Sequence, residues 1–192
     1  MSKLKDYIYV KEAVSAEVAD FAGKAVMIDL MTGQMDIDHD QVVGAKVKYR
    51  HSACEAMMLK VWKVAEEQTG LELCPTYSFI RHYTKGMDLK RHSDRPSCEI
   101  SATVCLTYDS DYLWPICAEG VDGTNASVEL DRGDLMIYRG CDIEHWRDPL
   151  EGNWWLQAFV HFIDKNGPYY PEFKHDKKEL PSIYNNIDFM DI

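Results

Sequence analysis

Two histidines and one aspartate in this chain have the side chains and the spacing to bind a metal ion. His92 and Asp94 form a His-x-Asp motif, and residues two positions apart in an extended strand point to the same side. His145, which follows a second strand-like stretch, offers a third ligand. Two imidazoles and one carboxylate make a facial triad with open coordination positions. This donor set suits Fe(II), and zinc and manganese are also compatible with it.

A His-x-Asp motif alone is weak evidence for a metal site, because an ordinary exposed pair has the same sequence. The context favours the metal site. The motif follows a predicted strand and a turn at Lys85-Gly86, and it precedes further strands that end near His145. No catalytic residue beyond the metal ligands is predicted.

The elements that must position these residues begin with two helices. The first is capped by Ser15 and carries apolar residues at helical spacing: Val18, Phe21, Ala22, Ala25 and Val26. The second is predicted to open with a capping box, in which Ser52 is the N-cap and Glu55 returns a hydrogen bond, and to end at Gly70. Its apolar stripe is Cys54, Met57, Met58, Val61, Trp62 and Ala65.

From about Pro75 the apolar period changes to two, which is typical of strands. We predict strands at 76–83, 98–107, 127–130, 135–138 and 154–162. In the last of these Trp155, Gln157, Phe159 and His161 share one face. The order predicts a mainly β, single-domain protein with N-terminal helices and an antiparallel barrel or jelly roll. Its parts are a helical N-terminal part (1–74), a jelly-roll core (75–164) and a C-terminal tail (165–192) that wraps the surface.

Composition excludes several classes of protein. The 192 residues include 21 Lys and Arg against 32 Asp and Glu, for a net charge of −11, which argues against nucleic-acid binding. We expect no membrane span and no secretory signal, because no sufficiently long apolar run is present. The six cysteines form no Cys-x-x-Cys pair, so structural zinc is not expected. Because we expect no secretory signal, a disulfide framework is not expected either. Free thiols indicate a reducing compartment, and we expect a cytoplasmic protein.

Several of these motifs together resemble the Fe(II)/2-oxoglutarate oxygenase superfamily, in particular its prolyl-4-hydroxylase-like branch. The motifs are the stretch from Ser78 to Gly86, His92-x-Asp94, Ala102-Thr103-Val104, Gly133-Asp134-Leu135 and His145. The resemblance covers 76–162. It implies a double-stranded β-helix that holds iron at His92, Asp94 and His145, with 2-oxoglutarate as cosubstrate and O2 as oxidant. Tyr83 and Thr103 match family positions that line the 2-oxoglutarate pocket.

One family feature is missing. The family usually places a Lys or Arg about ten residues after the distal histidine to bind the far carboxylate of 2-oxoglutarate. Here that position falls at Trp154-Trp155, and no basic residue occurs from Trp154 to Asp164. Arg147, Arg81 and Arg95 are the other candidates. Each could instead form a surface salt bridge, and Arg147 is favoured slightly over Arg81.

Two polar residues of the last strand share a face with Trp155. Gln157 could hydrogen-bond the cosubstrate or the substrate, whereas His161 is better interpreted as a buried, hydrogen-bonded core residue.

Three functions fit the sequence. The first is an Fe(II)- and 2-oxoglutarate-dependent dioxygenase that hydroxylates a peptidyl residue, proline among them, or a small molecule. The second is a cupin-like metal enzyme that does not use 2-oxoglutarate, which the missing base on the last strand favours. The third is a non-catalytic jelly-roll binding module.

Overall fold

The computed structural model describes residues 4–174 and 176 of the chain. It contains two helices, α1 (Ala16–Met31) and α2 (Ser52–Thr69), and one short 3₁₀ helix, η1 (Pro96–Cys98), among the described residues. The strands are β1 (Tyr7–Val10), β2 (Asp36–Ile37), β3 (Lys46–Tyr49), β4 (Leu73–Thr84), β5 (Leu89–His92), β6 (Ile100–Asp109), β7 (Ile116–Glu119), β8 (Asn125–Val128), β9 (Leu135–Arg139), β10 (His145–Arg147) and β11 (Trp154–Asp164). None of the helices in this part of the chain is long and apolar enough to cross a bilayer.

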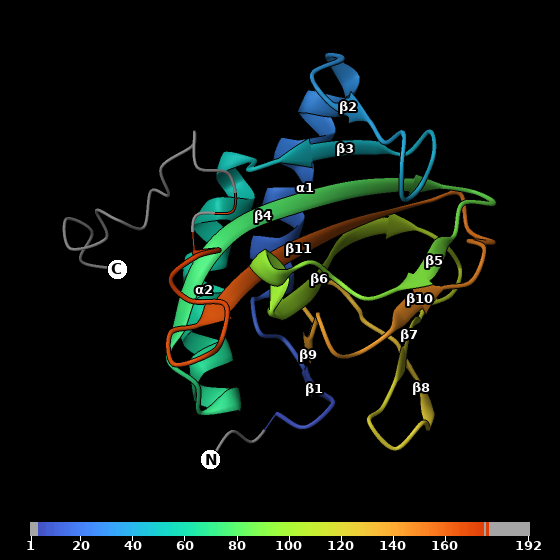
Figure 1. Cartoon of the computed structure of the whole chain (residues 1–192). Coiled ribbons are helices and arrows are strands. Elements are labelled where there is room, and N and C mark those ends of the chain that lie inside the picture. The colour runs from blue at the N-terminus through green and yellow to red at the C-terminus, as the bar shows by residue number, and fades with distance from the viewer. Residues whose placement is uncertain (1–3, 175, 177–192) are drawn as a thin grey trace.

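The strands form two antiparallel sheets. The larger sheet has the order β1-β9-β6-β11-β4-β3-β2, and the smaller has the order β5-β10-β7-β8 (Figure 1). Strands from the N-terminal part therefore complete both edges of the larger sheet, with β1 on one side and β2 and β3 on the other. This confirms a mainly β jelly roll with N-terminal helices.

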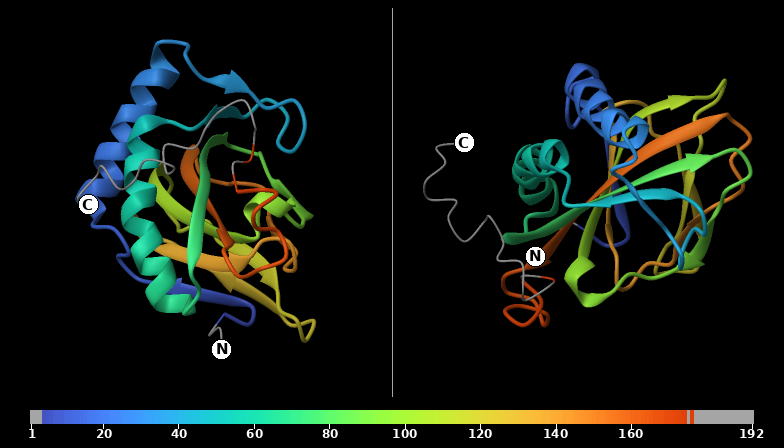
Figure 2. Two further views of the ribbon diagram at one scale, coloured as in Figure 1. Left: turned by 60° about the vertical axis from the view of Figure 1, so that its left-hand side comes forward. Right: turned by 90° about the horizontal axis from the view of Figure 1, so that it is seen from above.

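Both helices cover the outer face of the larger sheet (Figure 2). The Oγ of Ser15 accepts a hydrogen bond from the amide of Val18 and caps α1, as the sequence predicts. Of the apolar residues predicted for α1, Ala22 and Val26 are buried, but Phe21 is 71% exposed.

The predicted capping box of α2 is wrong. The N-cap is His51, whose Nδ1 accepts from the amide of Ala53, and helix α2 begins at Ser52. Glu55 is buried, and it accepts a hydrogen bond from the amide of Ser78 at 2.7 Å. Its carboxylate thus links the helix to strand β4. Gly70 ends the helix in the left-handed conformation, as predicted.

Strands β6 and β11 separate two hydrophobic cores, because their side chains alternate between the two faces of the larger sheet. Ile100, Ala102 and Val104 point to the core under the helices. Cys105 and Trp155 point to the core between the two sheets. Small polar residues on the same inner face, Ser101 and Thr103 among them, are fully buried. This inner face provides one wall of the site.

Candidate metal centre

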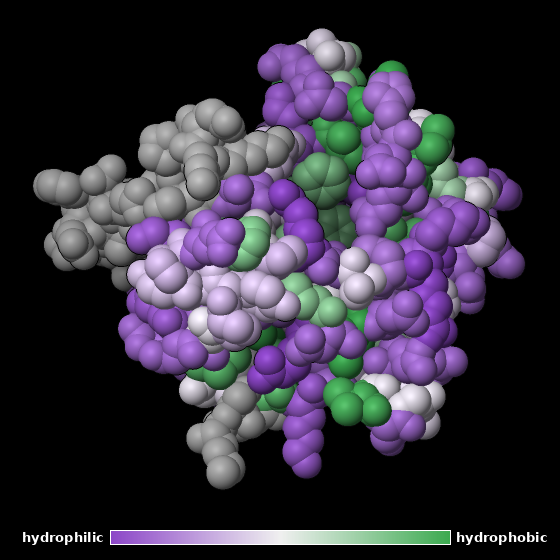
Figure 3. Space-filling view, in the orientation of Figure 1, coloured by the Kyte–Doolittle hydropathy of each residue, from purple (hydrophilic) through white to green (hydrophobic). Residues whose placement is uncertain are grey.

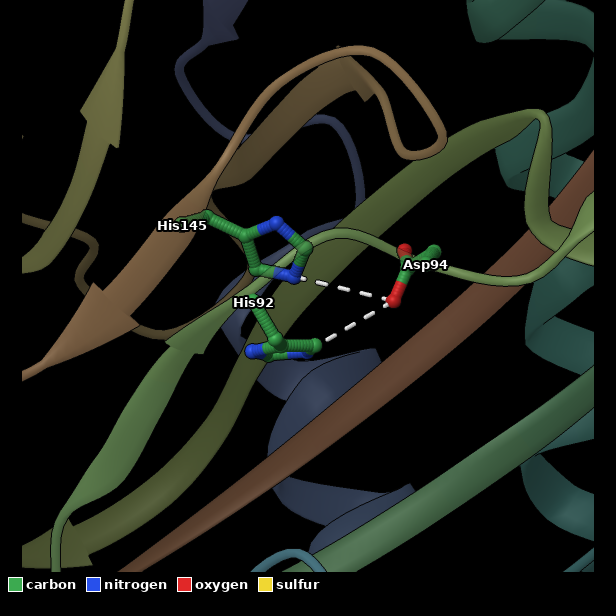
Figure 4. Close-up of side chains that lie close together, drawn as sticks. All are labelled: His92, Asp94 and His145. Carbon is green, nitrogen blue, oxygen red and sulfur yellow. Dashed lines mark ion pairs between the residues drawn. The ribbon is translucent and has the colours of Figure 1, made fainter.

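The two sheets bring His92, Asp94 and His145 together (Figure 4). His92 ends β5 and His145 begins β10, and the two residues are direct partners in the antiparallel ladder. Asp94 follows β5. The Nε2 atoms of both histidines lie 3.7 Å from Oδ1 of Asp94, and the three ligand atoms lie within 4.8 Å of one another. The three residues thus converge on one point between the sheets.

Backbone carbonyls orient both imidazoles toward that point. Nδ1 of His92 lies 2.7 Å from the carbonyl oxygen of Lys90, and Nδ1 of His145 lies 3.1 Å from that of Ile143. A carbonyl only accepts, so each Nδ1 carries a proton, and the tautomer this contact favours in a neutral ring has its lone pair on Nε2. Burial also lowers the pKa of His145, which keeps the ring neutral. A neutral imidazole with an available Nε2 lone pair is the form that binds a metal. The Tyr138 hydroxyl lies 3.4 Å from Nε2 of His145, beside the same point.

Asp94 is fixed by its backbone and by the oxygen that faces away from the histidines. Its amide donates to the carbonyl of Gly140 at 2.7 Å, and its Oδ2 accepts from the Oγ of Ser101 at 2.7 Å. A Cβ at Gly140 would lie 2.6 Å from that Oδ2 and 2.7 Å from the Ser101 Oγ. Only glycine therefore allows this close approach, which leaves Oδ1 facing the histidines.

A second hydrogen bond orders Ser101. Nδ1 of His161 lies 2.9 Å from the Ser101 Oγ, and burial lowers the pKa of His161 to about 4. The neutral ring donates its Nδ1 proton to Ser101, whose hydroxyl proton is then directed to Asp94. His161 is thus a buried, hydrogen-bonded residue, as the sequence suggested, and it acts on Asp94 through Ser101.

A Ser101→Ala substitution is expected to weaken metal binding by about 10–100-fold, the usual cost of losing a partner that orients a metal ligand. The measurement is the Kd for Mn(II) under anaerobic conditions. Ser110→Ala is the matched control. The Ser110 hydroxyl lies in a loop and, among the described residues, bonds only the backbone of Tyr112. Unchanged affinity in Ser101→Ala would show that Asp94 does not need this hydrogen bond.

The donor set fits a first-row divalent metal with open positions. It offers two imidazole nitrogens and one carboxylate oxygen from one side of the site. The side-chain exposure falls from 21% for His92 to 14% for Asp94 and 2% for His145, so the site is most accessible at His92. Asp94 also lies near Cys98 and His161, but there its Oδ2 is engaged by Ser101.

A cavity of about 730 Å³ opens beside the three residues. Aromatic rings form much of its wall: Tyr49, Tyr77, Phe79, Tyr138 and Phe159. Apolar side chains are visible in a recess near the upper centre of Figure 3, within a largely hydrophilic surface. The volume is in the range of small-molecule sites.

Arg81 is the predicted cosubstrate residue that lines this cavity. Its Nη2 donates to Oδ2 of Asp38 at 2.9 Å and to Gln41 at 2.7 Å, and its Nη1 contacts the Tyr83 hydroxyl at 3.3 Å. The positive charge of Arg81 is therefore balanced by Asp38 of the segment between β2 and β3.

The other predicted cosubstrate residues lie deeper between the sheets and do not line the cavity. Gln157 donates to the Thr103 hydroxyl at 2.6 Å and accepts from Nε1 of Trp155 at 2.8 Å. Tyr83 packs edge-on against Trp114 at 4.9 Å.

Arg147, the cation that the sequence slightly favours for the far carboxylate of 2-oxoglutarate, is 1% exposed and is not among the residues that line the cavity. Its guanidinium lies 4.6 Å from the ring of Trp114 and 5.9 Å from that of Trp155, and its Nη1 donates to the Trp114 carbonyl. Among the described residues, its Nε and Nη2 have no hydrogen-bond partner and no carboxylate forms an ion pair with it. Burial lowers its pKa.

Sequence reasoning did not single out Asp38 and Tyr49, which line the cavity, or Ser101, which bonds Asp94. Ser101 could have been found, because it lies on the same face of β6 as Thr103, the face of small polar residues opposite the apolar one. Asp38 lies 43 residues from its partner Arg81, in a segment without a periodic pattern.

No family profile and no curated protein matches the sequence. Solved structures do match the fold. A prolyl-4-hydroxylase from Pseudomonas putida has a TM-score of 0.66 at 18% identity, over 83% of this chain and 93% of that one. A prolyl hydroxylase from Trichoplax adhaerens, in complex with a peptide fragment of hypoxia inducible factor, has a TM-score of 0.67 at 10% identity, over 84% of each chain.

A third match is SnoN, an epimerase from nogalamycin biosynthesis whose structure contains Fe3+ and alpha ketoglutarate. Its TM-score is 0.68 at 13% identity, over 93% of this chain and 87% of that one. These matches include hydroxylases and an epimerase, so the shared property is the scaffold. The chain has the fold of the Fe(II)/2-oxoglutarate oxygenases.

Proposed function

We propose that this protein is an Fe(II)- and 2-oxoglutarate-dependent dioxygenase that hydroxylates a small molecule or a peptidyl residue. The observation that carries the proposal is the convergence of His92, Asp94 and His145 at the wall of a cavity, on this fold. In this proposal the two Nε2 atoms and Oδ1 of Asp94 hold Fe(II). When bound, the iron with 2-oxoglutarate and O2 supplies C–H oxidation coupled to formation of succinate and CO2.

The chain's own residues have three tasks in this function. The carbonyls of Lys90 and Ile143 hold the imidazoles in the binding tautomer, and Ser101 holds Asp94. The aromatic wall of the cavity covers the substrate and excludes water from the reacting atoms. A cation must bind the far carboxylate of 2-oxoglutarate.

We propose Arg147 for that carboxylate. Within the part of the chain that the structure describes, the buried guanidinium has unpaired Nε and Nη2 atoms and no carboxylate in an ion pair with it, which is costly, and an anionic ligand would offset the cost. Arg147 also lies beside Trp155, which occupies the sequence position where the family usually carries its basic residue. A cation on β10 would then serve in place of one on β11.

The alternative of a cupin-like metal enzyme without 2-oxoglutarate is favoured by the same Trp155, because the usual basic residue is missing. Anaerobic calorimetry separates the two functions. The dioxygenase binds 2-oxoglutarate in the presence of Mn(II), whereas the alternative enzyme gives no heat of binding.

Succinate formation tests the proposed function directly. Purified protein with Fe(II), 2-oxoglutarate and O2 is expected to release succinate slowly, and faster when a substrate is oxidised. Omitting Fe(II) or O2 should reduce the release to background. A protein that binds Fe(II) and 2-oxoglutarate but forms no succinate with any amino acid, peptide or carboxylic acid supplied would contradict the proposal.

A further inference from the structure

A carboxylate of the chain itself is bound at the wall of the cavity. Oδ1 of Asp176 lies 2.7 Å from Nη1 of Arg95, and its Oδ2 lies 3.1 Å from Nη2. The hydroxyl of Tyr49 donates to the same Oδ2 at 2.7 Å. The Asp176 side chain has no exposed surface, whereas that of Arg95 is half exposed. The Arg95 guanidinium thus faces both oxygens. Oδ2 accepts hydrogen bonds from Arg95 and Tyr49, whereas Oδ1 forms an ion pair with Arg95 without a hydrogen bond among the described residues.

Arg95 and Tyr49 belong to the same cavity as the metal ligands. Arg95 directly follows Asp94 in the chain, and both Arg95 and Tyr49 line the cavity. Burial and the hydrogen bond to Asp176 raise the pKa of Tyr49, so its hydroxyl stays protonated and donates. A paired guanidinium and a donor hydroxyl form a receptor for a carboxylate.

Aromatic rings continue from this receptor into the cavity. The ring centroid of Tyr77 lies 5.0 Å from that of Tyr49 and 4.7 Å from that of His161. Cζ of the Arg95 guanidinium lies 4.9 Å from the same Tyr77 centroid. Phe79 and Phe159, with centroids 6.5 Å apart, lie further along the same wall. A ligand that fits both parts has a carboxylate at one end and an apolar or aromatic body.

We propose that Arg95 and Tyr49 form the carboxylate subsite for a small carboxylic-acid substrate with an apolar or aromatic body, and that Asp176 occupies this subsite in the structure as an internal competitor. That this ligand is a substrate rests on the proposed function, whereas its binding to Arg95 and Tyr49 does not. Removing the Asp176 carboxylate therefore opens the subsite to an external carboxylate.

The test uses metal-free full-length protein, so the result does not depend on iron or turnover. Phenylacetate is the probe, and phenylacetamide, which has the same shape without the charge, is its control. In calorimetry or NMR titration, Asp176→Ala is expected to bind phenylacetate at least about ten-fold more tightly than the wild type, since an internal competitor is lost. It is also expected to prefer phenylacetate over phenylacetamide by about ten-fold, the size of a charge-assisted hydrogen bond.

Two further variants separate the subsite from general charge effects. Glu67→Ala removes an exposed carboxylate from α2 and should leave phenylacetate binding unchanged. Arg95→Gln combined with Asp176→Ala should abolish the preference for phenylacetate. If Asp176→Ala does not fold, Asp176→Asn keeps the side-chain shape and removes the charge. Equal binding of the two probes, or no gain over the wild type, would show that Asp176 is only a structural contact. Failure to form succinate would contradict the dioxygenase function and leave this binding result intact.

Discussion

An Asp94→Ala substitution is expected to abolish 2-oxoglutarate-dependent succinate formation and to weaken Fe(II) or Mn(II) binding by more than about 100-fold. That limit follows because losing an outer-shell partner already costs up to about 100-fold, and Asp94 is itself the proposed ligand. It is the only carboxylate of the triad, and its Oδ1 lies 3.7 Å from both Nε2 atoms. Metal affinity is measured by anaerobic titration, and succinate by chromatography.

Asp20→Ala provides the matched control for this variant. Asp20 is an exposed carboxylate on α1 that pairs with Lys24, so its loss should change neither metal binding nor turnover. Thermal unfolding of the metal-free proteins shows whether each variant folds. Full turnover by a folded Asp94→Ala protein would contradict the proposed metal centre.

An Arg147→Gln substitution is expected to raise the Kd for 2-oxoglutarate by about 10–100-fold, because it removes charge-assisted hydrogen bonds worth about 1.5–3 kcal/mol. It should not lower the thermal midpoint of the free protein. The side chain is a buried cation without a carboxylate partner among the described residues, and replacing such a charge by a neutral group is not destabilising in itself. Anaerobic calorimetry with Mn(II) gives the Kd.

Arg81→Gln is the comparison that decides between the two arginines. Arg81 lines the cavity, but its charge is balanced by Asp38 at 2.9 Å. We expect Arg81→Gln to lower the thermal midpoint, because it leaves Asp38 without its cation, and to change the Kd for 2-oxoglutarate less than Arg147→Gln does. The reverse order of the two Kd values would assign the carboxylate to Arg81.

Long strands with one clear period were predictable from the sequence. The alternation in 98–107 and 154–162 reproduces β6 and β11, including which residues share a face, because burial on each face of a sheet is imposed residue by residue. The types and spacing of His92, Asp94 and His145 predict a shared site, and in the structure one ligand atom of each lies within 4.8 Å of the other two.

Features that depend on distant contacts were not predictable. Strands β1, β2, β3, β5 and β10 have two to four residues each, too few to show a period. The sequence predicts that the Glu55 carboxylate caps the start of its own helix, but it accepts a hydrogen bond from the amide of Ser78 on β4. The burial of Arg147 depends on Trp114 and Trp155, which lie on other segments, and no local pattern in the sequence reports such a contact.

The direct pairing of His92 with His145 has a consequence for folding as well as for binding. Residues 92 and 145 are 145 − 92 = 53 positions apart, and β6, β7, β8 and β9 lie between them in the chain. An ion bound by both residues would act as a cross-link that closes this long loop. It would also stabilise the pairing of β5 with β10. In the proposed metal centre, metal loading and correct assembly of the smaller sheet would therefore be coupled, and a slip in the register of these two strands would separate the ligands and release the ion.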